Sequence, residues 1–329
     1  MEAPTPETLP PPPSVIGTIK AGFDTIANHL AVILLPLALD LLLWLGPLLS
    51  VKSAFLPALD YFRQFAEATK TPASDLERVV GVYAEALDRF NLLAVLRTFP
   101  IGISSLIQGA QPLDTPYGLP RLIQVTSPEG VVGWVILLTV AGWLGGAVYF
   151  RWVASVCAAP GQKVRLSTLG QSFTLSILFA ILILAVGAPL LFLLFVLFVI
   201  SPVLGQGLFL MLGFMSMWLV VPLFFAGHGI FIYSQDMFSS IFSGLRMARL
   251  TLPHSGSFVL LALILGMGLN YLWSVPPSNS WMLLVGILGH AFITTSLLAA
   301  SFIYYREANT WLQIVTERLK TGAVPLQRN

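Results

Sequence analysis

Three ionisable side chains stand inside otherwise apolar stretches of the sequence, and these are the residues best placed to do chemistry. Asp40 lies midway through the first apolar stretch, His228 stands between two glycines in the fourth, and His290 lies near the middle of the sixth. A charged side chain at the centre of a membrane costs about 2.5–3.5 kcal/mol on insertion scales, so each of the three is a functional candidate.

Asp40 and His290 would meet if the first and sixth helices were neighbours. A carboxylate–imidazole pair in lipid could then carry a proton or bind a cation. The alternative is a buried hydrogen-bonded pair that fixes helix register, or an Asp40 that is kept neutral. For His228 the alternative to a functional role is a simple backbone or interface contact, because its flanking glycines permit close helix packing.

Arg246 and Arg249 stand one turn apart on a short amphipathic stretch, where contact with anionic lipid headgroups is expected. The sequence contains no phosphate-binding glycine loop ending in Lys-Ser/Thr, no zinc-protease motif and no Gly-x-Ser-x-Gly nucleophile turn. The single cysteine, Cys157, excludes a disulfide framework and a multi-cysteine metal site. The sequence therefore predicts no catalytic residue, no cofactor and no metal ligand.

The composition explains what must position these side chains. Apolar residues make up 56% of the 329-residue chain and charged residues only 10%, against roughly 25% charged in soluble domains. A protein with so few charged residues has too little polar surface for water, whereas a surface that faces lipid needs little. The net charge of +2 and the absence of a basic patch argue against a nucleic-acid partner.

Six stretches have about the 20 mostly apolar residues that a spanning helix needs. The fold class predicted is therefore all-α, a polytopic protein of the bacterial inner-membrane type. The predicted spans are Leu30–Leu49, Val131–Val153, Leu175–Ile200, Leu208–Tyr233, Phe258–Trp273 and Trp281–Tyr304.

Three further stretches, ahead of the first, third and fifth spans, carry an apolar stripe at helical spacing. They predict amphipathic helices lying in the cytoplasmic membrane surface. Their repetition suggests three units of an in-plane helix and a helix hairpin, although any six-helix protein with both ends inside looks threefold. The stripes are Val15, Ile16, Ile19, Phe23, Ile26 and Leu30; Leu166, Leu169 and Phe173; and Phe238, Ile241, Phe242 and Leu245.

Lysines and arginines predict the orientation, because they concentrate on the cytoplasmic side. The connections 201–206 and 275–280 carry no charge, so both termini are predicted to be cytoplasmic, in the cell inner (plasma) membrane. The basic residues on the other connections and ends are Lys20, Arg151, Lys163, Arg165, Arg246, Arg249, Arg306, Arg318, Lys320 and Arg328.

Residues 51–130 form the one long connection, and long loops translocate largely regardless of charge. Its periodicity predicts two amphipathic helices and then an irregular return rich in proline. The predicted organisation is a proline-rich disordered tail (1–13), an in-plane helix and the first span (14–50), an extracytoplasmic helical cap (51–130), the remaining bundle (131–306) and a cytoplasmic tail (307–329).

Two parts of the chain resemble a known family. One is MWLVVPLFFAGHGIFIYSQDMFSSIFSGLRMARLTLPHSGSFVLLALILGMGLNYLW, from Met217 to Trp273, and the other is SVIGTIKAGFDTIANHLAVILLPLALDLLLWL, from Ser14 to Leu45. Both resemble the uncharacterised six-helix YciC-like membrane family and the membrane domain attached to some glycerophosphodiester phosphodiesterases. The resemblance covers the spans but not the cap. It implies a membrane-embedded domain without assigned chemistry, and it assigns a role to no residue.

The function expected from these features is that of a non-enzymatic membrane protein, a scaffold or an accessory subunit of an assembly. Its partners would be the lipid bilayer and membrane proteins that contact the 51–130 cap. The alternative is a small-molecule or lipid transporter that uses Asp40 and His290. An enzyme acting on lipid is a third reading, which no residue specifically supports.

Overall fold

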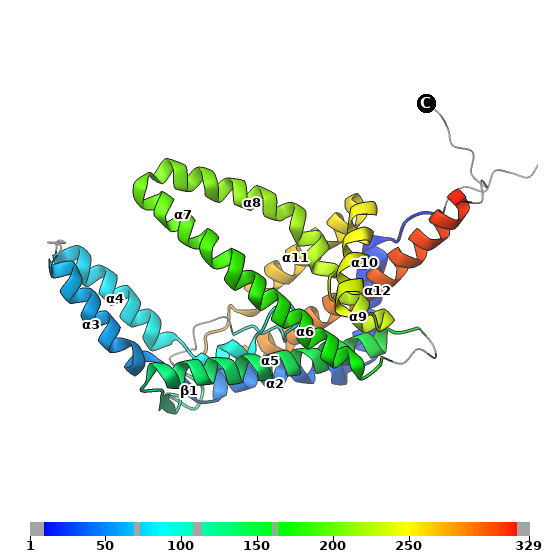
Figure 1. Cartoon of the computed structure of the whole chain (residues 1–329). Coiled ribbons are helices and arrows are strands. Elements are labelled where there is room, and N and C mark those ends of the chain that lie inside the picture. The colour runs from blue at the N-terminus through cyan, green and yellow to red at the C-terminus, as the bar shows by residue number, and fades with distance from the viewer. Residues whose placement is uncertain (1–9, 69–72, 108–113, 160, 162–163, 321–329) are drawn as a thin grey trace, which may run out of the picture. The chain divides into compact units, whose positions relative to one another are not determined.

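The structure is a computed structural model that describes residues 10–68, 73–107, 114–159, 161 and 164–320. It is almost entirely helical (Figure 1). Most of the predicted tail 1–13 and the end of the predicted tail 307–329 lie outside the described residues. The helices are α1 (Val15–Ala27), η1 (Leu30–Ile33), α2 (Leu34–Leu45), α3 (Lys52–Ala68), α4 (Ala73–Arg89), η2 (Leu92–Leu96), α5 (Pro128–Cys157), α6 (Ser167–Leu182), η3 (Ile183–Gly187), α7 (Ala188–Ile200), α8 (Pro202–Phe225), α9 (His228–Tyr233), α10 (Met237–Leu250), α11 (Leu252–Trp273) and α12 (Met282–Lys320).

Among the described residues, four helices are long and apolar enough to cross a membrane, and six segments qualify if each of two bent pairs is one span. The four are Pro128–Cys157, Ser167–Ile200, Leu252–Trp273 and Met282–Lys320. In the first bent pair, Val15–Ala27 meets Leu30–Leu45 at 92°. In the second, the bend within Pro202–Tyr233 is 43°. The prediction of a mainly helical chain with several apolar helices of membrane length is confirmed.

The first predicted span ends earlier than expected. Helix α2 ends at Leu45, and Gly46 is extended, because the following Pro47 disfavours the helical conformation of the residue before it. Residues Leu48–Ser50 then form a strand, β1, which pairs in parallel with β2 (Leu122–Gln124). This two-stranded sheet was not anticipated by the all-α prediction.

The third predicted span is the middle and end of a longer helix. α6, η3 and α7 follow one another without a gap from Ser167 to Ile200, so no break separates the predicted in-plane stretch from the span. The π-helical turn η3 lies just before Pro189. Because proline has no N–H and clashes with the preceding turn, a wider turn accommodates it inside the helix.

The chain divides into two compact units, whose boundaries fall between α1 and η1 and inside α5, α11 and α12. Unit 1 comprises residues 1–29, 150–266 and 295–329. Its core is aromatic and gathers around the middle of α12. Gly22 of α1 allows close contact there, since a Cβ at that position would lie 2.5 Å from the carbonyl oxygen of Ser296. Farther along α12, the Trp311 indole donates to the carbonyl of Pro10 at 2.7 Å.

Unit 2 comprises residues 30–149 and 267–294. Two apolar clusters hold it together. One joins the small sheet to η2 and α5 through Leu49, Val51, Leu92, Val125 and Leu138. The other joins α2 to the start of α12 and to the irregular return through Trp44, Leu106, Leu283 and Ile287.

Candidate functional site

Asp40 is fully buried in unit 2, where its carboxylate binds the irregular segment that follows η2. The Ser105 hydroxyl donates to Oδ1 at 2.5 Å, and the Ile107 N–H donates to it at 3.3 Å. The Leu106 N–H lies 2.9 Å from Oδ1 and 3.1 Å from Oδ2. Successive backbone N–H groups converging on one anion form a stable cradle. The carboxylate is therefore already occupied by three donors from the protein itself.

His290 is also buried in unit 2, with 5% of its surface exposed. Its Nε2 has no hydrogen-bond partner among the described residues. The bonds of Asp40 go to residues 105–107 instead, so the pair envisaged for Asp40 and His290 is not present in this structure. One turn along α12, Thr294 donates to the His290 carbonyl at 2.8 Å and receives a bond from Ser104 at 2.9 Å.

His228 belongs to unit 1, at the start of the short helix α9, and is 4% exposed. Its Nε2 lies 2.8 Å from the Ser301 hydroxyl on α12. Aromatic rings surround the imidazole, with ring centroids between 4.9 and 5.6 Å away. Through its contact with Ser301, the buried His228 joins α9 to α12. The surrounding rings are those of Phe224, Phe225, Phe302 and Tyr305.

A polar network that the sequence analysis did not identify holds the turn between α9 and α10. Ser240 donates to the carbonyl of Ala226 at 2.7 Å and accepts the N–H of Ile230 at 3.1 Å. Ser243 lies 2.9 Å from Gln235 Oε1 and 2.7 Å from the Tyr305 hydroxyl. Serines in amphipathic helices are usually solvated, so their types alone gave no signal of this network.

Helix α10 has two different faces. It buries Met237, Ser240, Gly244, Met247 and Ala248, so the face packed on the protein is built of small and flexible side chains. The predicted lipid-contacting residues Arg246 and Arg249 are exposed, as are Phe238, Phe242 and Leu245 of the predicted apolar stripe. Asp236 caps the helix, and hydrogen bonds from Ser239 hold the pKa of that carboxyl below its usual range.

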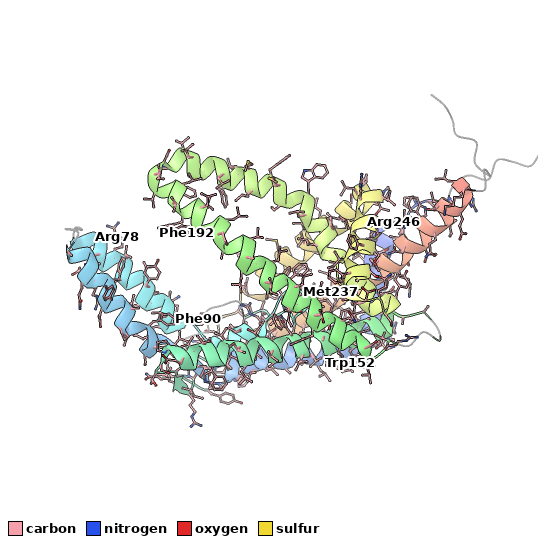
Figure 2. All side chains as sticks on the ribbon, in the orientation of Figure 1. Arg78, Phe90, Trp152, Phe192, Met237 and Arg246 are labelled. Atoms are coloured by element: carbon pink, nitrogen blue, oxygen red, sulfur yellow. The ribbon has the colours of Figure 1, made fainter. Side chains whose placement is uncertain are left out.

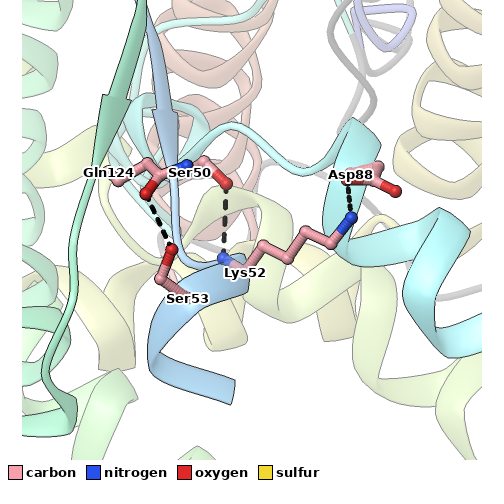
Figure 3. A network of polar contacts seen from close by, with 5 residues as sticks. All are labelled: Ser50, Lys52, Ser53, Asp88 and Gln124. Atoms are coloured by element: carbon pink, nitrogen blue, oxygen red, sulfur yellow. Dashed lines mark hydrogen bonds and ion pairs between the residues drawn. The ribbon is translucent and has the colours of Figure 1, made fainter. Parts of the chain in front are cut away.

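The α3–α4 hairpin, residues 52–89, is the most elaborated part of the predicted cap. Its two helices pack side by side (Figure 1), with Phe90 at its base and Arg78 farther along α4 (Figure 2). Polar contacts fix the base (Figure 3). Lys52 forms an ion pair with Asp88 at 2.7 Å, which joins the start of α3 to the end of α4. Ser53 donates to Gln124 at 3.0 Å, which joins α3 to the strand β2.

The same hairpin exposes large apolar side chains beyond its base. Tyr61 is 74% exposed and Tyr83 56% exposed. A two-helix hairpin has too little interior to cover every apolar side chain of two amphipathic helices. The remaining exposed members of this set are Phe55, Leu56, Phe62, Val79 and Val82.

Substitution of Ser301 by alanine is expected to destabilise unit 1. The imidazole Nε2 of His228 would lose the partner it now has, and an unpaired buried polar group costs about 1–3 kcal/mol. Thermal unfolding in detergent measures the effect. Ser257→Ala is the matched control, because this exposed serine only bonds to the carbonyl of Pro253 in its own helix. Equal melting temperatures for the two variants would contradict a structural role for the His228–Ser301 contact.

No group of three or more histidine, cysteine, aspartate or glutamate side chains that could hold a metal ion occurs in the described part of the chain. Comparison with protein families, with curated proteins and with solved structures finds no match. The site must therefore be interpreted from its own geometry.

Proposed function

We propose that this protein is a non-enzymatic integral membrane protein that serves as a scaffold or accessory subunit, and that it binds a membrane-protein partner through the α3–α4 hairpin. The observation that carries the proposal is the set of exposed apolar side chains on this hairpin, which includes both of its tyrosines, Tyr61 and Tyr83. Aromatic side chains are enriched where proteins bind one another, since they bury much area at low entropic cost.

The topology that accompanies this function has six spans. Each of the bent pairs 15–45 and 202–233 supplies one of these crossings. The 51–130 cap belongs to the extracytoplasmic side, and both termini lie in the cytoplasm of a bacterial cell. The distribution of lysine and arginine supports this orientation. The right-angle bend before α2 supports an in-plane α1.

A protein partner accounts for the hairpin better than a lipid surface does. Between residues 52 and 89 the chain carries five basic and six acidic residues, so the net charge of this segment is −1. Membrane-surface helices that hold to anionic lipid are usually basic. The fixed base, with its Lys52–Asp88 ion pair and Ser53–Gln124 bond, would present the hairpin in one orientation to a partner.

The double substitution Tyr61→Asp and Tyr83→Asp tests this function. Charge placed in an apolar contact is expected to abolish recovery of the partner in a mild-detergent pulldown from native membranes. A central aromatic residue of an interface commonly contributes about 2 kcal/mol or more, so two of them correspond to a loss of binding of at least about a hundredfold. Far-ultraviolet circular dichroism and gel filtration would establish that the variant is folded.

Leu119→Asp is the control, because Leu119 is 80% exposed in the same insert but outside the hairpin. The control should retain the partner. Recovery of one and the same partner by the double variant, or the absence of any partner specific to the unmodified protein, would count against the proposal.

Transport remains the alternative, but no observation favours it. The carboxylate of Asp40 already accepts hydrogen bonds from three donors of the chain, so an incoming ion or solute would have to displace them.

A further inference from the structure

Residues 97–107, which follow η2 in the cap, have no helix or strand, and yet all of them except the exposed Phe99 are at least partly buried within unit 2. Ile101 is 1% exposed, and Ser105 and Leu106 are 6% and 5% exposed. An irregular surface loop would instead have its backbone in water. This segment is therefore part of the interior of its unit.

Helix α5 makes room for the segment with two glycines one turn apart. A Cβ on Gly142 would lie 2.5 Å from the carbonyl oxygen of Leu96, and a Cβ on Gly146 would lie 2.7 Å from the Cα of Gly102. Such distances are shorter than real contacts, so no other residue fits without backbone movement. Gly142 and Gly146 therefore pack against the end of η2 and the irregular segment that follows it.

Helices α2 and α12 contact the segment as well. Asp40 on α2 accepts from Ser105, Leu106 and Ile107. On α12, Thr294 accepts from Ser104 at 2.9 Å, and the buried side chain of Leu106 packs with residues of the first turns of the same helix. Helices α2, α5 and α12 thus surround one non-helical stretch.

The contacts lie deep within these helices. Thr294 is about 18 Å along α12 from its first residue, and Gly142 is about 21 Å along α5, at a rise of 1.5 Å per residue. Asp40 stands close to the middle of α2, and Gly142 and Thr294 stand close to the midpoints of the spans predicted for residues 131–153 and 281–304. The hydrocarbon core is about 30 Å thick, so a stretch that touches all three midpoints reaches its centre.

Backbone groups at that depth need partners, because each unsatisfied group in hydrocarbon costs several kcal/mol. Helices satisfy their own groups, whereas an irregular segment must receive partners from its surroundings. The carboxylate of Asp40 supplies acceptors to two adjacent N–H groups and one hydroxyl. Within the segment, the Thr98 hydroxyl donates to the Ile101 carbonyl at 2.9 Å. These hydrogen bonds offset the cost of placing a carboxylate in the membrane, and they also pair donors that would otherwise lack an acceptor.

We propose that residues 97–107 form a re-entrant segment, which enters the membrane from the side of the 51–130 cap and is held at mid-depth by Asp40. The role of Asp40 is to fasten non-helical backbone between α2, α5 and α12. The inference rests on the proposed topology, in which the cap is extracytoplasmic. The segment also connects the α3–α4 hairpin to the membrane interior, since α4 leads through η2 directly into it.

Cysteine labelling in intact cells tests the segment. In a Cys157→Ser background, single cysteines replace Leu119, which is 80% exposed, and Ser104 or Ile103 in the segment. A membrane-impermeant maleimide is added from outside, and labelling in denaturing detergent defines the total. We expect Leu119→Cys to react and both segment cysteines to stay unreactive until denaturation.

Adding Asp40→Asn should release the segment. The amide retains one acceptor oxygen but turns a donor NH₂ toward backbone N–H groups. The loss of hydrogen bonds to the carboxylate should raise the labelling rate of Ser104→Cys by about tenfold or more. Asp24→Asn, on an exposed part of α1, should leave that rate unchanged.

The outcomes separate the two proposals. Failure of Leu119→Cys to react from outside, with reaction after permeabilisation, would overturn the topology. Reaction of Leu119→Cys together with equally fast reaction of both segment cysteines would leave the topology standing and overturn the re-entrant segment. An Asp40→Asn background that left Ser104→Cys protected would remove Asp40 as the group that holds the segment.

Discussion

Replacement of Asp40 by leucine is expected to destabilise the folded protein, although leucine enters a membrane more readily than aspartate does. The substitution leaves the Ser105 hydroxyl and the N–H groups of Leu106 and Ile107 without their acceptor. Each unpaired buried donor costs about 1–3 kcal/mol, so the free energy of unfolding should fall by about 3 kcal/mol or more.

The sign of this effect distinguishes two roles for the carboxylate. A carboxylate that served only as a carrier would be a liability to the fold, and leucine would then raise the melting temperature in detergent. A structural carboxylate gives the opposite result. The melting temperature of Asp40→Asn should lie between those of the unmodified protein and the leucine variant, because the amide carbonyl oxygen still accepts a hydrogen bond. Unfolding followed by tryptophan fluorescence is suitable, since Trp44 lies on the same helix and is fully buried. Increased stability of the leucine variant would contradict the assignment.

Alanine substitutions at Gly146 and Gly133 are expected to have opposite effects, although both glycines belong to α5. A Cβ at position 146 would stand 2.7–2.9 Å from backbone atoms of Ile101 and Gly102, which cannot rotate away as a side chain can. Overpacking of this kind costs about 1–3 kcal/mol. At position 133 nothing lies within 4 Å of the added methyl, and alanine is favoured over glycine in a helix by about 1 kcal/mol.

Melting temperatures of the two variants, measured in the same detergent, provide the comparison. Gly146→Ala should melt below the unmodified protein, and Gly133→Ala should melt at the same temperature or above it. A Gly146→Ala protein as stable as Gly133→Ala would mean that the segment around Gly102 does not pack closely on α5.

The helices could be predicted from the sequence because their cause is local. A run of some twenty apolar residues has few alternatives to a helix in lipid, and most of the described helices coincide with such runs. The early end of α2 also had a local cause, since Gly46 and Pro47 stand in the sequence as a visible break. The two short strands had no such signal, because three residues show no periodicity.

The environment of Asp40 could not be predicted in the same way. Two of its three donors are backbone N–H groups, which almost any residue supplies, and they lie more than sixty residues farther along the chain. The rarity of an aspartate within an apolar run indicated that something must bind it. Which groups bind the carboxylate, however, depends on the path of the irregular segment 97–107. The glycines at 142 and 146 likewise indicated close packing but not that an irregular backbone would be the neighbour.

The bond between the Trp311 indole and the Pro10 carbonyl has a topological consequence. Residue 10 precedes all apolar segments of the chain, and residue 311 follows the predicted end of the last one at Tyr304. In the proposed six-span topology residues 10 and 311 lie in the same aqueous compartment, as their direct contact requires. An enzyme tag or antibody epitope added at either end is therefore expected to report from one and the same face of the bilayer.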